Sequence, residues 1–159
     1  MARPLEDEPL LASVRDRLAG LEGSGRFAGR QNLDQFLASV HRDLQELLNT
    51  RWCVTSWPPG LEELESSLVN YGIPDFTGAN MSSPNERLLF CELVEKSIKL
   101  HDSRFISVRL KIKDDRDSMD RIFRFQIEAE VQASPEPAEV VFDSEVDPTS
   151  RRIHVKLNP

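Results

Sequence analysis

The chain has 159 residues, 39% hydrophobic and 30% charged, and its formal net charge at pH 7 is −7. This composition predicts one soluble, folded domain with a modest core rather than a disordered chain. The 20 basic residues form no run, so nucleic acid and anionic membrane surfaces are not expected partners. No apolar run approaches the roughly 20 residues that a membrane span needs, and the acidic N-terminus lacks a secretory signal pattern, so a cytosolic protein is expected.

Residues 1–30 are predicted to form a short helix and a flexible linker, ahead of a single domain over residues 31–159. Apolar residues recur at helical spacing within residues 9–19, which is typical of a short amphipathic helix. Four glycines then lie between residues 20 and 30, with charged residues among them. Glycine at this density leaves the backbone unrestrained, so this stretch is expected to be the linker.

The strongest helical pattern covers residues 31–49. Seven apolar residues make one stripe along this helix: Leu33, Phe36, Leu37, Val40, Leu44, Leu47 and Leu48. The polar residues between them are expected on the opposite side, facing water: His41, Arg42, Gln45, Glu46 and Asn49. The helix is therefore predicted to pack its apolar face on the core.

A shorter helix is expected around residues 61–69, and the segment after it, residues 70–78, ends that helix in a turn. Gly72 suits the left-handed backbone that follows a helix end. Pro74 forces the residue before it out of the helical region. The apolar anchors of this segment and the acid of its turn are Tyr71, Phe76 and Asp75.

A third helix is predicted to start at Ser83, and a sheet follows it. Ser83, Pro84 and Glu86 match a capping box with proline at the first helical position. After residue 104 the hydrophobic period changes from 3.6 to 2, which indicates strands. The predicted strands span residues 106–112, 123–133, 140–142 and 153–157, with a polar hairpin loop at residues 114–117. This order predicts an α+β fold in which N-terminal helices pack on one face of an antiparallel sheet of about four strands.

No motif for metal, phosphate or nucleophilic chemistry is present. The three histidines are scattered, without Cys-x-x-Cys or His-x-x-x-His spacing, so no metal site and no cofactor are expected. Cys53 and Cys91 lie far apart among apolar residues, which favours buried thiols of a reducing compartment over a disulfide. No Gly-x-Ser-x-Gly elbow exists, and no catalytic residue is predicted.

Glycoside hydrolysis needs two carboxylates that flank a sugar, and the acidic residues show no such pair. No glutamate is followed nine positions later by an aspartate, which is the spacing of phage-type lysozymes. Glu128 and Glu130 share one strand face, and a solvated polar surface explains them. A peptidoglycan hydrolase is kept as a disfavoured alternative, which turnover of purified cell wall would establish.

Residues 100–105 join the third helix to the first strand and contain a candidate partner-binding pair, Asp102 and Arg104. One explanation is an ordinary helix end, at which the arginine helps to satisfy terminal carbonyl groups. The other is a charged junction that docks a partner protein. Because exposed ion pairs are common and weak, the residues alone favour the helix end.

Three segments together resemble one family, in the same order and with matching spacing. They are residues 39–51 (SVHRDLQELLNTR), 67–78 (SLVNYGIPDFTG) and 141–149 (VFDSEVDPT). The family is TssE, the type VI secretion baseplate subunit, which is related to a phage tail baseplate wedge protein often labelled lysozyme-like. The resemblance extends from about residue 9 to the C-terminus.

The resemblance implies structural work without catalysis or a cofactor. Such proteins lie in the baseplate at the cytoplasmic face of the inner membrane, without inserting into it and without binding nucleic acid. They contact the TssF and TssG wedge subunits and begin the contractile sheath. Their sheet resembles the strand-exchange part of a sheath subunit, so a free sheet edge is expected to accept partner strands.

The family's Glu-Pro-Arg-Leu motif corresponds to Asp102-Ser103-Arg104-Phe105 at the helix–strand junction. The acid and the arginine are kept in type, but the proline is lost, which leaves the junction less rigid. The resemblance implies these partner-binding residues: Tyr71, Asp75, Phe76, Asp102, Arg104 and Phe105. A small adaptor of an unrelated complex stays open as a third alternative, against which neighbouring sheath genes would argue.

Overall fold

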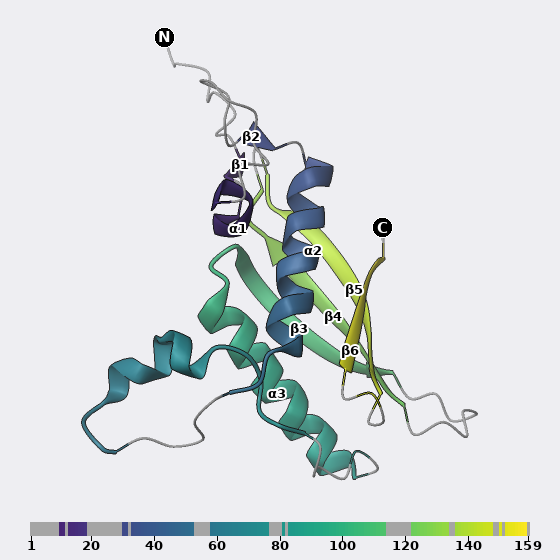
Figure 1. The fold of residues 1–159 in the computed structure, drawn as a ribbon. Helices are drawn as coiled ribbons and strands as arrows, with labels where there is room; N and C mark the ends of the chain where they lie inside the picture. The colour runs from purple at the N-terminus through teal and green to yellow at the C-terminus, as the bar shows by residue number, and fades with distance from the viewer. Residues whose placement is uncertain are drawn as a thin grey trace.

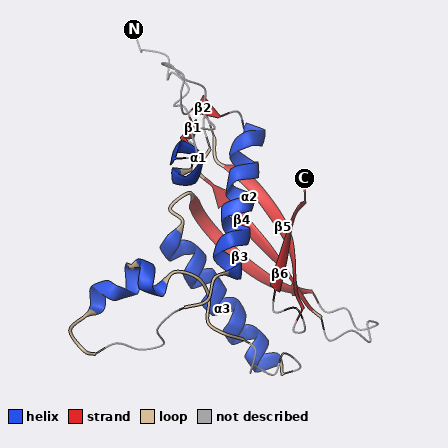
Figure 2. Cartoon of the chain, viewed as in Figure 1, coloured by secondary structure: helices blue, strands red, loops and turns tan. Residues whose placement is uncertain are grey.

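The computed structural model shows two long helices over a four-stranded antiparallel sheet (Figures 1 and 2). It describes residues 10–11, 13–18, 30–31, 33–52, 58–76, 81, 83–113, 122–133, 136–147, 150 and 152–158. The main elements are α2 (Leu33–Asn49), α3 (Pro84–His101), β3 (Phe105–Lys113), β4 (Phe123–Val131), β5 (Ala138–Asp147) and β6 (Arg152–Asn158). The predicted α+β fold, with helices before an antiparallel sheet, is confirmed.

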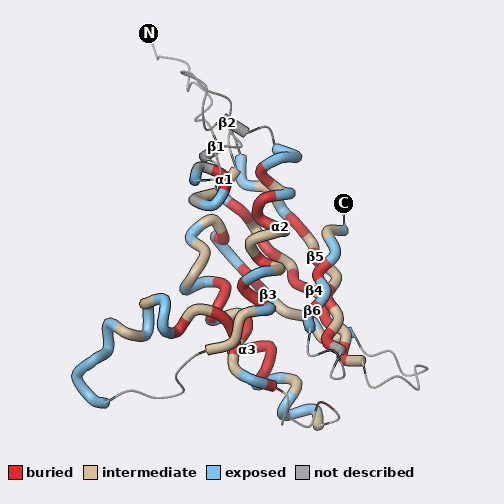
Figure 3. Tube along the Cα trace, viewed as in Figure 1, coloured by how far each residue is buried: buried red, intermediate tan, exposed pale blue. Residues whose placement is uncertain are grey.

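One apolar core lies between the helices and one face of the sheet. α2 packs against β6 and α3 against β3, and the buried residues, red in Figure 3, gather where these elements meet. Phe90 of α3 meets Phe76, Phe123 and Phe125 edge-on, with ring centroids 5.6 to 5.9 Å apart. Each such pair adds about 0.5–1.5 kcal/mol beyond the burial of its area, so this cluster fixes α3 on β4.

The sheet order is β3–β4–β5–β6, and every neighbouring pair is antiparallel. Between Phe105 and Ser107 the register with β4 shifts, which marks a β-bulge. The bulge leaves both Phe105 and Val108 buried, whereas Ile106 is 52% exposed. A strict period of two would place Ile106 on the same face as Val108, but the inserted residue reverses the alternation.

The N-terminal region differs from the helix predicted over residues 9–19. Its first two described residues form strand β1 (Leu10–Leu11), which pairs antiparallel with β2 (Arg30–Gln31). Helix α1 (Val14–Leu18) begins only after Ser13, whose hydroxyl accepts a hydrogen bond from the backbone N–H three residues later, at 3.2 Å. A serine in this position caps a helix start, so the helix is shorter than the apolar pattern suggests.

The helix predicted around residues 61–69 is instead two 3₁₀ segments, η1 (Glu62–Ser66) and η2 (Leu68–Asn70). Ser67 separates them, and its hydroxyl accepts a hydrogen bond from the N–H two residues later, at 3.3 Å. Such a local side-chain bond competes with the helical pattern. The positive φ expected at Gly72 is confirmed, with a value of 112°.

Helix α3 begins where Ser83 and Pro84 predict, but the capping box does not form. The Ser83 side chain makes no capping hydrogen bond, and its carbonyl oxygen accepts the first helical N–H, at 3.1 Å. Strand β5 is longer than the predicted residues 140–142. It gains length because it pairs with β4 on one side and with β6 on the other.

The polar side of α2 faces water only in part: Glu46 and Asn49 are exposed, as predicted, but His41, Arg42 and Gln45 are half-buried. His41, Gln45 and Asn49 hydrogen-bond to the backbone of β6. The expectation that this whole side is only solvated is wrong, because polar side chains at a helix flank can also hydrogen-bond to an unpaired strand edge.

Cys91 is a buried free thiol, as predicted. Three other predictions fall outside the described residues: the linker over residues 20–29, the hairpin loop at residues 114–117, and Cys53. Of the helices in the described part of the chain, none is both long and apolar enough to cross a membrane.

Candidate partner-binding site

The junction between α3 and β3 is a tight turn built on Asp102. Its N–H donates to the carbonyl oxygen of Ile98 at 3.0 Å and so ends the helix. Its carboxylate accepts the backbone N–H of Arg104 at 3.0 Å, a local bond that aspartate favours in turns. Phe105 then starts β3 with a buried side chain. Asp102 thereby supplies a turn geometry without a proline.

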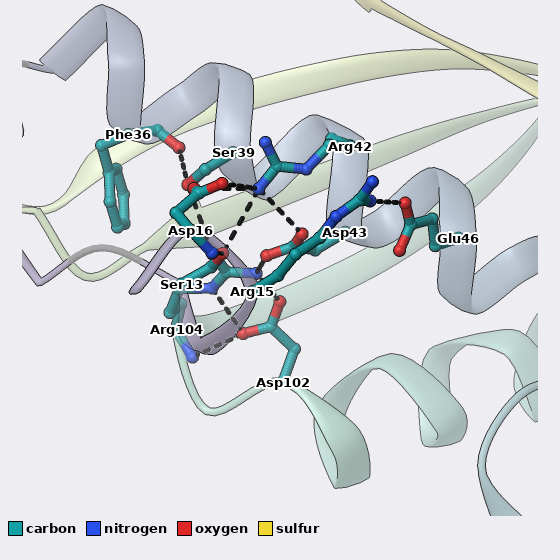
Figure 4. Close-up of polar contacts among 10 residues, drawn as sticks. All are labelled: Ser13, Arg15, Asp16, Phe36, Ser39, Arg42, Asp43, Glu46, Asp102 and Arg104. Carbon is teal, nitrogen blue, oxygen red and sulfur yellow. Dashed lines mark hydrogen bonds and ion pairs between the residues drawn. The ribbon is translucent and has the colours of Figure 1, made fainter. Parts of the chain in front are cut away.

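Arg104 connects this junction to α2 (Figure 4). Its Nε and Nη2 donate to the two carboxylate oxygens of Asp102, at 2.9 and 2.6 Å. The same Nη2 donates to Asp43 Oδ2 of α2, at 2.9 Å. The side chains of Asp102, Arg104 and Asp43 are 13%, 20% and 21% exposed. Arg104 therefore bonds carboxylates, and the expectation that it satisfies helix carbonyl groups is wrong, because two acids lie within its reach.

A second arginine extends the cluster toward the N-terminus. Arg42 Nη2 donates to Asp16 Oδ2 at 2.9 Å and to Ser13 Oγ at 3.3 Å, and it lies 3.3 Å from Asp43 Oδ1. Asp16 is only 6% exposed, so α1 is held on α2 by a mostly buried carboxylate (Figure 4). We call Asp16, Arg42, Asp43, Asp102 and Arg104 the junction charge cluster.

The junction charge cluster holds both arginines in their charged form. Burial alone would lower the pKa of Arg104, but the hydrogen bond and charge of Asp102, with those of Asp43, outweigh it and raise the pKa. For Arg42, the hydrogen bond to Asp16 is the largest cause of a raised pKa. Two guanidinium groups that stay charged in fixed positions form a pattern of charge that a partner can recognise by complementarity.

Tyr71 lies beside the junction charge cluster. Its half-buried ring meets His101 edge-on, with centroids 5.2 Å apart. His101 Nε2 donates to the carbonyl oxygen of Asn70 at 2.9 Å, which anchors the 70–76 segment on α3. Burial raises the pKa of the Tyr71 hydroxyl, and the charges of Asp43 and Asp102 add to this effect. The structure thus brings Tyr71, Asp102 and Arg104 together.

The other predicted residues are not members of this cluster. Phe76 is 6% exposed and packs in the core, with the Arg51 guanidinium 4.4 Å above its ring. Asp75 is half-buried, and its charge acts on Arg51, whose pKa burial lowers. Phe105 is likewise buried. Phe76 and Phe105 can therefore influence a partner only through the shape of the surface above them.

Sequence reasoning missed three members of the cluster: Asp16, Arg42 and Asp43. One signal was available on α2, because Ser39 and Asp43 are polar, four residues apart, and therefore share a helix face. Ser39 is buried and donates its hydroxyl to the Phe36 carbonyl at 2.8 Å. No pattern in the sequence indicates the pairing of Asp16 with Arg42 across 26 positions.

The described residues show no arrangement suited to metal chemistry. Within this part of the chain, no group of three or more His, Cys, Asp or Glu side chains could hold a metal ion. A hollow on α3 is lined by two acids and two bases as well as one leucine: Glu92, Glu95, Lys96, Lys99 and Leu100. The Glu95 carboxylate accepts the backbone N–H of Leu110 at 2.6 Å, so it serves the fold.

A comparison with protein-family models gives the class of protein to which this geometry belongs. Residues 34–136 match the family described as baseplate wedge protein gp25. The match covers more than half of the chain and includes α2, α3, β3 and β4. The chain therefore belongs to the baseplate wedge protein gp25 family, a family of structural proteins in phage-type baseplates. No individual curated protein and no solved structure matches the chain.

Proposed function

We propose that the chain is a non-catalytic component of a type VI secretion baseplate that binds the TssF and TssG wedge subunits and anchors the contractile sheath. The observation that carries this proposal is the family match over residues 34–136. The resemblance of residues 39–51, 67–78 and 141–149 to TssE supports the finer assignment. On this proposal the protein works in the cytoplasm, at the cytoplasmic face of the inner membrane.

Within this function, residues 31–159 are the wedge-like domain, and the surface around the junction charge cluster is the wedge contact. Tyr71, Asp102 and Arg104 lie together there, partly exposed. Asp75 would contribute from the adjoining segment. Phe76 and Phe105 would hold the surface in shape from beneath, because both are buried.

The test is co-purification of the tagged chain with TssF, TssG and sheath subunits expressed in the same cells. The wild-type chain should capture the wedge subunits in stoichiometric amounts. Arg104→Glu should lose them, since it places a third carboxylate beside Asp43 and Asp102. Lys99→Glu makes the same charge change on an exposed position of α3 and should retain capture.

A second variant separates a lost contact from a lost fold. Tyr71→Ala leaves the ion pairs of Arg104 in place and removes a ring that is part of the same surface. It should fold, as judged by circular dichroism and a cooperative melt, and still bind wedge subunits less well. If both folded variants capture the wedge as wild type does, this surface is not the contact. Turnover of purified cell wall by the wild-type chain, abolished by a single Glu→Gln change, would instead establish the hydrolase alternative.

A further inference from the structure

The two edges of the sheet are β3 and β6 (Figure 1). Side chains of neighbouring elements contact the two edges differently. At β6, side chains of α2 occupy the outward backbone groups. The Ile153 N–H donates to Asn49 Oδ1 at 3.1 Å. The Val155 N–H donates to Gln45 Oε1 at 2.9 Å. The outward N–H groups of two of the three outward-facing β6 residues are therefore already bonded, and only Leu157, near the C-terminal end of the strand, is not reached by a described side chain.

The carbonyl groups of the same two β6 residues are bonded as well. The Ile153 carbonyl accepts from Gln45 Nε2 at 2.5 Å and from Asn49 Nδ2 at 2.8 Å. The Val155 carbonyl accepts from His41 Nε2 at 2.9 Å. His41, Gln45 and Asn49 are four residues apart and project from one side of α2. We call these three residues the α2 ladder, and over Ile153 and Val155 it occupies the β6 edge as an added strand would.

At the β3 edge, a side chain of the described residues bonds one outward backbone group. The Leu110 N–H donates to Glu95 Oε1 at 2.6 Å, so this N–H points away from β4. Alternate residues of a strand direct their backbone groups the same way, so the N–H and C=O groups of Val108 and Ile112 also point outward. No hydrogen bond to another described residue engages these outward groups.

The apolar side chains at this edge are also incompletely covered. Leu110 and Ile112 lie on the core face of β3 but are only half-buried, whereas the core-face residues of β4 are buried throughout. Glu95, whose carboxylate accepts the Leu110 N–H, also helps to line the hollow on α3. A further strand with apolar residues on this face would complete their burial.

The opposite face of β3 carries positive charge. Arg109, Lys111 and Lys113 alternate along it and are exposed. Lys111 pairs with Glu128 at 2.5 Å, and Lys113 pairs with Asp143. Arg109 forms no ion pair within the described part of the chain. If the β3 strands of two copies paired, their positive side chains would lie opposite one another and repel, which disfavours a second copy of this chain as the partner. A strand with acidic side chains on this face would instead be attracted.

We propose that β3, and not β6, is the edge that receives a partner strand, and that this strand alternates acidic residues on the outer face with apolar residues on the core face. The inference rests on the proposed function, because a sheath or wedge subunit would supply the strand. In the free protein the Glu95 carboxylate accepts the Leu110 N–H. When the strand adds, a carbonyl group of that strand replaces the carboxylate as the acceptor. The α2 ladder keeps β6 closed, so the sheet grows in one direction only.

The first test uses a seven-residue peptide that alternates Glu and Val, with the isotope-labelled full chain. In the free protein the Ile153 and Val155 amides should exchange slowly, and those of Val108 and Ile112 quickly. Saturating peptide should slow exchange at Val108 and Ile112 by about tenfold or more. Protection at β6, no protection at β3, or protection of β3 that grows with protein concentration alone, would overturn the proposal; the last outcome indicates a second copy.

Matched charge reversals test the chemistry of the partner strand. Arg109→Glu on β3 should weaken peptide binding about threefold to tenfold. Lys156→Glu makes the same charge change on the outer face of β6, where Lys156 is 75% exposed, and should leave binding unchanged. Glu95→Ala should strengthen binding, because its carboxylate no longer competes for the Leu110 N–H. Equal effects of the two reversals would contradict a β3 site.

Co-purification with sheath subunits then separates this inference from the proposed function. Capture by wild type and Lys156→Glu, lost in Arg109→Glu, supports both. Capture by all three forms keeps the proposed function and overturns the β3 assignment. If wild type captures no sheath or wedge subunit, the proposed function fails, and the peptide experiment alone decides whether β3 accepts a strand.

Discussion

At the residue scale, Gly72 fixes how the 70–76 segment lies between the two long helices. Its φ of 112° is one that side chains rarely allow, and a Cβ at this position would overlap the carbonyl group of Thr50. Its own carbonyl oxygen accepts hydrogen bonds from Trp52 Nε1, at 2.7 Å, and from Ser97 Oγ. The next residue, Ile73, donates its N–H to the Thr50 carbonyl at 3.0 Å. A side chain at Gly72 would separate these groups.

Gly72→Ala is therefore expected to lower the free energy of unfolding by about 2 kcal/mol or more, from backbone strain together with the clash. Gly60→Ala is the matched control, because Gly60 also has a positive φ, of 92°, but nothing lies within 4 Å of its added Cβ. It should cost about 1 kcal/mol, for strain alone. Urea denaturation of both variants measures the difference. Equal losses of unfolding free energy would show that the backbone at Thr50 moves away from the added Cβ without an energetic penalty.

Cys91 links stability to alkaline pH. Cys91 as a whole residue is only 5% exposed. Burial, with smaller contributions from the charges of Glu95 and Glu92, raises its pKa from the ordinary 9.0 to about 11. Because the folded-state pKa is the higher one, the unfolded chain loses this proton first. The stability that the neutral thiol contributes is complete below pH 9 and is lost as pH rises toward 11.

Between pH 8 and pH 10, wild type is expected to lose about 1 kcal/mol more unfolding free energy than Cys91→Ala does. Urea denaturation of both proteins at several pH values in this range measures the two slopes. The comparison is between slopes, so the cost of the substitution itself cancels. Parallel slopes would mean that the thiol ionises in the folded protein as easily as in the unfolded one.

At the element scale, α2 uses two of its sides for the fold. Its apolar stripe enters the core, as the sequence predicts, except for Leu33, which is 45% exposed. The α2 ladder on its flank serves β6, which the sequence does not indicate, because polar residues at helical spacing are equally typical of a wet surface. These side chains bond β6 because β6 is an edge strand with no further strand beside it in the described part of the chain. Edges of this kind are commonly covered by a helix.

Gln45 is the central member of the α2 ladder, since its amide both accepts from Val155 and donates to Ile153. Gln45→Ala is expected to cost about 1–2 kcal/mol of unfolding free energy, because part-buried backbone groups lose their partner. Amide exchange at Val155 should accelerate, while exchange in β4 should change only in line with global stability.

Glu46→Ala is the control for this prediction. Glu46 is adjacent to Gln45 but pairs with Arg15 at the surface, where both side chains are more than half exposed. Its loss should cost less than about 0.5 kcal/mol. Unchanged exchange at Val155 in Gln45→Ala would show that water replaces the glutamine amide without penalty.

At the scale of the whole molecule, charged residues in different regions serve different purposes. The junction charge cluster joins α1, α2 and the α3–β3 junction, and its members are held by one another. The outer face of the sheet carries pairs across strands, such as Lys111 with Glu128. Surface pairs of this kind add little stability, but they determine which strand can lie beside an edge. The net charge of −7 therefore conceals a basic edge at β3.

The sequence alone determined the fold class and the order of the elements. Helical spacing in residues 31–49 and period-two alternation after residue 104 predicted α2 and the sheet, because burial of one face imposes these periods on any chain. It also located Asp102 and Arg104 as a pair, through their place at an element junction. Local turn chemistry predicted the positive φ at Gly72, since only glycine adopts it freely.

The tertiary structure alone decided what these residues contact. Arg104 bonds Asp43, 61 positions away, and Asp16 bonds Arg42, 26 positions away. The bulge that exposes Ile106 and the α2 ladder that closes β6 likewise depend on neighbours distant in the sequence. Periodicity records which side of an element is apolar, but it does not record which partner occupies the polar side. That partner is set by packing, because hydrogen bonds form only between groups that the fold has already brought together.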